Sequence, residues 1–196
     1  MANFKTMIRT LMFVFVVLFC ATTFYYYTEQ GNARAEANIP KLPDFEHTNN
    51  QQFIDNVVQC VNYIEHNTTD VYPVNLELLL AQAALESGWG NSRFARVGKN
   101  LFGIRTYDLK EPHMLPSNNP KKWGVKVYSH ECDSVLNYMQ VLNNGGAYEK
   151  YRELMNNGEN DPYILVETLD AYASDKYYFS KVKSILTKIR SEYAIK

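Results

Sequence analysis

Apolar residues recur at helical spacing along most of the chain. Between residues 51 and 66 they return every three or four positions, beginning with Phe53 and Ile54. This spacing places them on one face of an α-helix. Gly88 follows the second such segment and is suited to the left-handed conformation that ends a helix. The same periodicity predicts further helices over 75–86, 92–97, 132–142, 147–155, 162–172 and 178–189.

The pattern changes between residues 100 and 128. Two short runs, 101–107 and 123–128, are rich in aromatic and β-branched residues. A segment rich in proline and asparagine, from Pro112 to Pro120, separates them. These features predict two strands joined by a long loop. The expected fold is therefore α+β and mostly helical, with one small β-hairpin lobe.

The first 35 residues differ from the rest. Lys5 and Arg9 give a basic start, residues 11–21 are uninterruptedly apolar, and Ala33-Arg34-Ala35 is a small-residue cleavage motif. This three-part pattern is typical of a secretory signal peptide. The apolar stretch with Tyr25 to Tyr27 also approaches the length of a membrane span, so an uncleaved inner-membrane anchor is the alternative. Either way we expect an exported protein, periplasmic or extracellular, with membrane contact through this segment only.

Three parts are expected along the chain. Residues 1–35 are the signal or anchor, and residues 36–48, which contain Pro40 and Pro43, are a linker. Residues 49–196 form the remaining part. A chain of 196 residues suffices for one compact domain with a substantial core.

Composition narrows the range of partners and cofactors. The formal net charge of −1 does not indicate a nucleic-acid partner. The four histidines are scattered and the sequence contains no HExxH or CxxC motif, so we expect no metal and no other cofactor. Cys60 and Cys132 would remain after cleavage. An exported pair can form a disulfide, but two free buried thiols are the alternative.

Glu86 is the strongest candidate for a catalytic residue. It follows Ala83 by three residues and Leu79 by seven, which places it on the apolar face of its predicted helix. Apolar surroundings and a helix C-terminus both raise the pKa of a carboxyl group. A raised pKa is what a general acid needs to protonate a glycosidic oxygen near neutral pH. The alternative is that Glu86 reaches solvent from a frayed helix end.

Three motifs follow one another in the chain: AQAALESGWG at 81–90, NLFGI at 100–104, and Tyr172-Ala173-Ser174-Asp175 followed by Tyr178 and Lys181. Together they resemble the glucosaminidase domain of family 73 of the glycoside hydrolases. This family includes bacterial autolysins, flagellar muramidases and Bax-like proteins. The resemblance covers residues 50–190 and makes residues 49–196 the glucosaminidase domain. It implies a lysozyme-like fold with a glycan cleft between a helical lobe and a small β lobe.

The resemblance also implies roles for individual residues. Glu86 matches the catalytic acid of the family, and Tyr172 matches a tyrosine that faces this acid across the cleft. For Phe102 a core-packing role is the alternative to substrate contact. Substrate-binding positions are implied for Ser87, Trp89, Phe102 and Asp175.

The sequence departs from the family pattern at the second carboxylate. Many members carry one near the second strand, whereas residues 119–128 contain no aspartate or glutamate. Glu111, in the preceding loop, is one candidate for this group. Alternatively the N-acetyl group of the substrate supplies the nucleophile, as in substrate-assisted glycosidases. Tyr172 would then position that group.

The expected activity is hydrolysis of peptidoglycan after N-acetylglucosamine, with Glu86 as general acid and glycan strands as the partner. A lytic transglycosylase that cleaves after N-acetylmuramic acid is an alternative, because it shares the fold and needs only one glutamate. A non-catalytic glycan-binding protein is a second alternative. Mass spectrometry of the digested wall distinguishes all three.

Overall fold

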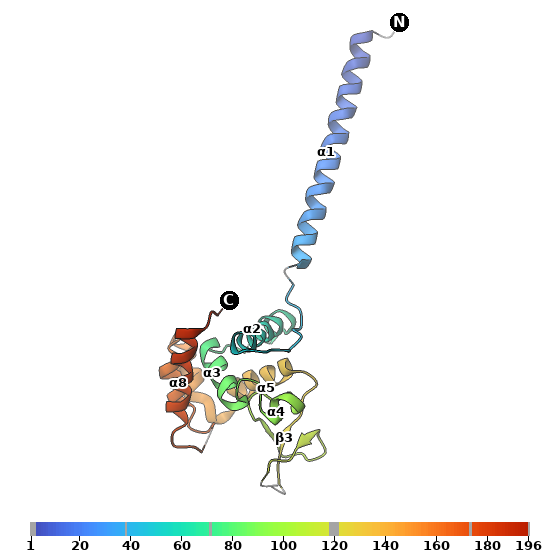
Figure 1. The fold of residues 1–196 in the computed structure, drawn as a ribbon. Helices are drawn as coiled ribbons and strands as arrows, with labels where there is room; N and C mark the ends of the chain where they lie inside the picture. Colours follow the sequence, from blue (N-terminus) through green and yellow to red (C-terminus); the bar gives the residue numbers. More distant parts are fainter. Residues whose placement is uncertain (1–2, 38, 71, 118–121, 173, 196) are drawn as a thin grey trace. The chain divides into compact units, whose positions relative to one another are not determined.

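The computed structural model describes residues 3–195, except for residues 38, 71, 118–121 and 173. It forms two compact units, Met1–Pro40 and Lys41–Lys196. The first unit is built on one long helix, α1 (Phe4–Ala37) (Figure 1). Its segment Met7–Gln30 is long and apolar enough to cross a membrane. The helix also runs through residues 33–35, where the cleavage motif lies.

The second unit confirms most of the expected helices. The prediction of a helix over 162–172 is wrong after Thr168, where the helical structure ends. There the Thr168 hydroxyl donates to the carbonyl of Leu165, and the chain then turns through a bond from Tyr172 N to Leu169 O. The helices are α2 (Asn50–Asn67), α3 (Leu76–Ser87), α4 (Arg93–Gly98), α5 (Glu131–Asn144), α6 (Glu149–Asn156), α7 (Pro162–Leu165) and α8 (Tyr178–Glu192), with 3-10 turns η1 (Gly146–Tyr148) and η2 (Val166–Thr168).

Helix α3 is the centre of the core. Every residue from Leu78 to Ala84 is buried, so this helix is enclosed on all sides rather than along one stripe. It packs against α2, α7 and α8. The side chain of Asn75 caps its first turn, and Gly88, with φ of 59°, ends it in the left-handed conformation. The buried helix thereby delivers its last turn, which carries Glu86, to a fixed place.

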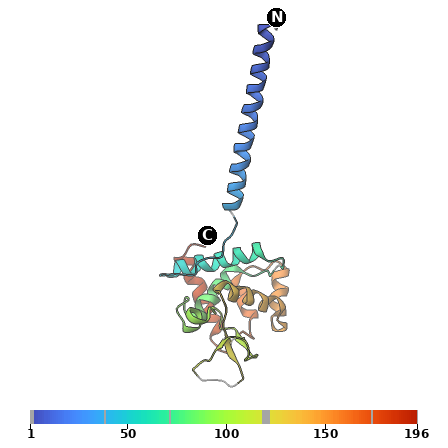
Figure 2. The same cartoon turned by 90° about the vertical axis from the view of Figure 1, so that its right-hand side faces the viewer.

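The β lobe is a three-stranded sheet rather than the expected two-stranded hairpin. Its strands are β1 (Arg105–Thr106), β2 (His113–Met114) and β3 (Gly124–Lys126), in the antiparallel order β1-β3-β2. Strand β2 forms inside the segment expected as a loop, where a Cβ on Gly124 would lie 2.4 Å from the His113 ring. Only glycine leaves room for that ring. The sheet lies at the end of the unit opposite α2 (Figures 1 and 2).

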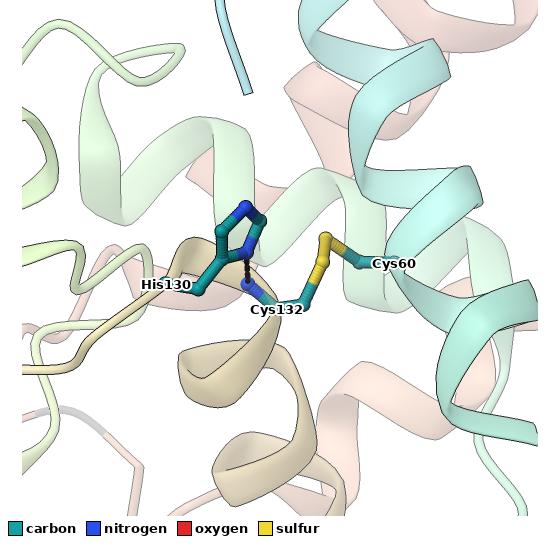
Figure 3. Close-up of side chains that lie close together, drawn as sticks. All are labelled: Cys60, His130 and Cys132. Carbon is teal, nitrogen blue, oxygen red and sulfur yellow. Dashed lines mark hydrogen bonds between the residues drawn. A yellow bond between two sulfur atoms is a disulfide. The ribbon is translucent and has the colours of Figure 1, made fainter. Parts of the chain in front are cut away.

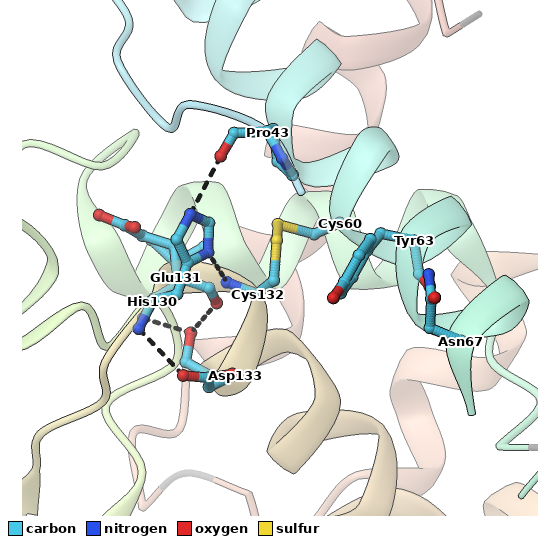
Figure 4. The surroundings of a disulfide bond; sticks show 10 residues. Pro43, Cys60, Tyr63, Asn67, His130, Glu131, Cys132 and Asp133 are labelled. Atoms are coloured by element: carbon cyan, nitrogen blue, oxygen red, sulfur yellow. Dashed lines mark hydrogen bonds between the residues drawn. A yellow bond between two sulfur atoms is a disulfide. The ribbon is translucent and has the colours of Figure 1, made fainter. Parts of the chain in front are cut away.

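A disulfide between Cys60 and Cys132 joins α2 to α5, with the two Cα atoms 4.9 Å apart (Figure 4). The free-thiol alternative is therefore wrong. Next to it, His130 caps α5 by accepting from Cys132 N (3.0 Å) and donates to the carbonyl of Pro43 (3.0 Å). His47 similarly donates to the carbonyl of Trp89. The second half of the expected linker, residues 41–48, thus packs onto the globular unit.

Candidate active site

The turn after α3 is built from buried hydrogen bonds. The hydroxyl of Ser87 donates to the carbonyl of Ala83 (2.6 Å) and accepts from Gly90 N (2.7 Å). Trp89 has a positive φ of 57°, and Gly88 precedes it in the same region. This tight turn carries the chain away from the helix immediately after Glu86. The carboxyl group consequently projects from the end of a buried helix.

Glu86 is half-buried, and its burial raises the pKa of its carboxyl group above the ordinary value of 4.5. A hydrogen bond from Tyr178 and the positive charge of Lys181 oppose this rise without cancelling it. Gly103 passes close to the carboxyl, because a Cβ added there would lie 3.9 Å from Glu86 Oε2. The fold thus brings the first two motifs together at Glu86.

Tyr172 lies close enough to Glu86 for the two side chains to interact electrostatically. Its ring stacks on that of Tyr178, with centroids 5.7 Å apart, and its hydroxyl donates to the carbonyl of Phe102 (3.3 Å). Burial raises the pKa of both tyrosines well above the ordinary value, and the nearby Glu86 raises it further. Both hydroxyls therefore stay protonated at neutral pH and are available as hydrogen-bond donors.

Gln82 and Tyr178 belong to the first and third motifs, but the sequence predicted no chemical role for either residue. Gln82 lies one turn before Glu86 and is completely buried. Its amide donates to the Tyr178 hydroxyl (2.7 Å) and accepts from the Tyr138 hydroxyl (2.5 Å). In the sequence, Gln82 stands out only as a polar amide inside an apolar run, four residues before Glu86.

The residues implied for substrate binding have different surroundings. Ser87 is buried, and its hydroxyl is used within the turn. Phe102 is 3% exposed, and its ring stacks on that of Tyr138 with centroids 4.1 Å apart. This agrees with the alternative that Phe102 packs in the core. Trp89 packs against Phe53 and Tyr193. Asp175 is exposed and pairs with Lys181 at 2.5 Å, which lowers the pKa of its carboxyl.

Glu111 lies in the β lobe. Its Oε2 atom accepts from the hydroxyl of Thr106 (2.9 Å) and lies 3.5 Å from Nζ of Lys126. Thr106 is in β1 and Lys126 is in β3, so these contacts connect the loop to both strands. The carboxylate braces the sheet in this arrangement.

Cys60, His130 and Cys132 place potential metal-ligand atoms within 4.8 Å of one another (Figure 3). Both sulfur atoms are consumed by the disulfide, however. Both ring nitrogens of His130 have hydrogen-bond partners, Cys132 N and the Pro43 carbonyl. The cluster therefore fits a capped, cross-linked helix start and does not fit a metal centre.

Comparison with known families gives a match over residues 65–191, which is more than half of the chain. The matching family is the glucosaminidase family, described as mannosyl-glycoprotein endo-beta-N-acetylglucosaminidase. The matched segment contains the three motifs that meet around Glu86.

Two curated bacterial proteins are similar to the chain. Peptidoglycan hydrolase FlgJ of Vibrio parahaemolyticus is 34% identical over 135 residues, which cover 60% of this chain and 42% of that protein. Exo-glucosaminidase LytG of Bacillus subtilis is 28% identical over 127 residues, which cover 60% of this chain and 45% of that protein. The chain thus spans less than half the length of these two relatives.

The fold is also similar to a solved structure. The catalytic domain of the autolysin Auto from Listeria monocytogenes superposes with a TM-score of 0.54 at 25% identity. The match covers 83% of this chain and 94% of the other. A mostly helical unit with a small antiparallel sheet confirms the expected lysozyme-like α+β class. With the family match, these findings show that the chain belongs to the glucosaminidase family, family 73 of the glycoside hydrolases.

Proposed function

We propose that this protein is a peptidoglycan hydrolase that cleaves the β-1,4 bond after N-acetylglucosamine, with Glu86 as general acid. The observation that carries the proposal is the half-buried Glu86 carboxyl, whose pKa is raised by burial at the end of an enclosed helix. A raised pKa increases the fraction of the carboxyl group that is protonated at a given pH, and the protonated form is the one that can protonate the leaving oxygen. Membership of the glucosaminidase family supports the substrate class.

In this proposal the nucleophile that attacks the anomeric carbon is the N-acetyl group of the substrate and not a second carboxylate of the protein. The contacts of Glu111 with Thr106 and Lys126 support a bracing function in the β lobe rather than nucleophilic attack. In the substrate-assisted route, the acetamido oxygen of N-acetylglucosamine attacks its own anomeric carbon while the bond to the leaving oxygen breaks. Glu86 gives its proton to that oxygen. Water then opens the cyclic intermediate and returns a proton to Glu86.

Tyr172 is the group best suited to orient the acetamido group. It lies near Glu86, and its hydroxyl keeps its proton because burial raises its pKa. Its bond to the Phe102 carbonyl is long at 3.3 Å, so a substrate acceptor can compete for this donor. Holding the reacting atoms in place contributes several kcal/mol to such steps. Asp175, exposed beside Lys181, is the implied binding residue best placed to meet a glycan.

The first 35 residues are proposed to direct export, either as a cleaved signal or as a retained anchor. Two features support this: the apolar segment Met7–Gln30 and the disulfide between Cys60 and Cys132. Disulfides persist in oxidising compartments and are rare in the cytosol. In this proposal the globular unit acts outside the cytoplasm, where the wall lies, and membrane contact is confined to the N-terminal segment.

The test compares Glu86→Gln with the matched control Glu77→Gln on purified peptidoglycan. Glu77 lies at the other end of α3 and pairs with Arg190, so its loss tests the helix without touching the candidate acid. We expect Glu86→Gln to lower the rate about 10²–10⁴-fold, because an amide cannot supply the proton. The control should keep most activity. Wild-type rates in Glu86→Gln would refute the assignment.

Mass spectrometry of the products tests the cleavage position. Reducing N-acetylglucosamine ends are expected. Anhydro-muramic ends would show a lytic transglycosylase instead, and an undigested wall would show a binding protein.

A further inference from the structure

Tyrosines from separate parts of the chain form a cluster around Tyr172. Measured between centroids, its ring lies 5.7 Å from that of Tyr178, 6.1 Å from that of Tyr138 and 6.5 Å from that of Tyr148. Tyr138 comes from α5, Tyr148 from η1 and Tyr178 from α8. Electrostatic interaction with Glu86 raises the pKa of Tyr172, and so does interaction with Tyr148. The cluster therefore connects Tyr148 to the neighbourhood of the candidate acid.

The hydroxyl groups of the cluster differ in their hydrogen bonds. Those of Tyr138 and Tyr178 both bond to the side-chain amide of Gln82. That of Tyr172 donates to a main-chain carbonyl. Within the part of the chain that the structure describes, the hydroxyl of Tyr148 has no hydrogen-bond partner. A phenol group can both donate and accept, so Tyr148 has this capacity available for a ligand.

The hydroxyl of Tyr148 reaches the surface although the ring is packed inside the protein. The residue is only 9% exposed. Among the described residues, no fully enclosed side-chain oxygen or nitrogen lacks a hydrogen-bond partner. The unpaired hydroxyl oxygen therefore belongs to the small exposed part of this side chain. Burial raises the pKa of Tyr148, so the hydroxyl keeps its proton at neutral pH and can donate it to an acceptor.

The turn before Tyr148 holds this side chain in place. Arg152 donates from Nη1 to the carbonyl of Leu142 (2.8 Å) and to that of Gly145 (2.7 Å), which ties the turn to α6. A Cβ on Gly145 would lie 2.9 Å from the Tyr148 ring, so the ring packs directly on the turn. Fixing a hydrogen-bond donor before the ligand arrives lowers the entropic cost of binding. The hydroxyl of Tyr148 is therefore preorganised.

We propose that Tyr148 is a substrate-binding residue, whose hydroxyl donates to an oxygen of the N-acetylglucosamine unit that lies against Tyr172. This inference rests on the proposed function and extends it. The hydroxyl and acetamido oxygens of a sugar accept hydrogen bonds, and two neighbouring phenol groups can bind two oxygens of one sugar unit. Tyr172 orients the acetamido group, while Tyr148 holds the same unit equally in the ground state and the transition state. Such uniform binding lowers KM and leaves kcat unchanged.

The test substitutes Tyr148→Phe in the full chain, solubilised in detergent, and measures turnover of purified peptidoglycan. Loss of one hydrogen bond between neutral groups should raise KM about 2- to 10-fold, whereas kcat should stay the same. Because the deleted hydroxyl has no partner among the described residues, Tm should also stay the same. An unchanged KM would overturn the proposal.

Tyr151→Phe is the matched control, because it makes the same chemical change at a buried tyrosine whose hydroxyl is used inside the protein. That hydroxyl accepts from Asn75 N (3.1 Å). Its removal leaves a buried N–H group without a partner, which costs stability. The control should therefore have a lower Tm and an unchanged KM. The same result in Tyr148→Phe would show a structural role and overturn the proposal.

A binding experiment separates this inference from the proposed function. Cosedimentation with purified peptidoglycan compares Glu86→Gln with the double variant that also carries Tyr148→Phe, and it needs no turnover. We expect the second substitution to weaken binding about 2- to 10-fold. Failure of the proposed function would appear as wild-type activity in Glu86→Gln, whereas failure of this inference would appear as equal binding by the single and double variants.

Discussion

Removal of the Cys60–Cys132 disulfide should strongly destabilise the globular unit. The bond closes a sequence separation of 72 residues. In the chain-entropy model, opening a loop of that length gives the unfolded state about 4.4 kcal/mol of additional freedom at 25 °C. For a unit of this size, each kcal/mol corresponds to roughly 2–4 °C, so Tm should fall by roughly 9–18 °C. Alanine is the replacement of choice, because both positions are buried and a serine hydroxyl would need a partner.

The assay is calorimetry of three variants without reductant: Cys60→Ala, Cys132→Ala and the double substitution. Either single substitution already removes the cross-link, so the second adds only the loss of local packing. The three variants should therefore have similar Tm values, all far below that of the wild type. This non-additivity is the signature of two groups that act as one bond.

Small and additive losses in the two single variants would refute the cross-link. A thiol count on the denatured wild type gives an independent check. The sequence has three cysteines, and only Cys20 is free among the described residues, so one reactive thiol is expected in the uncleaved chain and none after removal of the first 35 residues. Three reactive thiols would refute the disulfide directly.

Three further outcomes are expected. Burial raises the pKa of Glu86 above 4.5, so the folded state loses stability relative to the unfolded state as pH rises through that raised value. Glu86→Gln cannot ionise, so its Tm should be higher than that of the wild type at pH 8 and equal to it below pH 4.5. Gly103→Ala should lose about 1–2 kcal/mol of stability, because Gly103 has a φ of 64°, and should also lose activity, because the added methyl group approaches Glu86. The control Gly158→Ala, at a φ of 86°, should lose only stability. Equal activities of the two variants at a temperature where both are folded would contradict this. Tyr172→Phe should lower kcat more than Glu111→Gln does, and the reverse order in turnover assays would make Glu111 the second catalytic carboxylate.

Much of the fold could be predicted from the sequence because local rules and tertiary packing agree. The expected helix at 51–66 and its observed counterpart, Asn50–Asn67, differ by one residue at each end. Helix α3 likewise begins after the Asn75 cap and ends at Gly88. Strand β2 was missed because it has only two residues and is held by pairing with β3. Such a strand leaves no periodicity in the sequence for a pattern to detect.

The candidate site was predictable at Glu86 and less so around it. Spacing placed Glu86 toward the apolar side of a helix, which agrees with its partial burial. The bond between Tyr178 and Gln82 spans 96 residues of sequence, and no local rule pairs two positions so far apart. Periodicity also cannot distinguish a tyrosine that only fills the core from one whose hydroxyl also takes part in a buried hydrogen bond. Tyr178 does both, since it is buried and its hydroxyl accepts a hydrogen bond from Gln82.

Most residues of the first two motifs make contacts inside the protein. In the first motif, Ser87 makes the turn after α3, and Gln82 binds two tyrosine hydroxyls. In the second, Phe102 fills the core, while Gly103 leaves space beside Glu86. The contacts of these residues lie within the protein, in the core and around the Glu86 carboxyl group. Changes at these buried positions are therefore expected to alter the burial and the surroundings of the Glu86 carboxyl group.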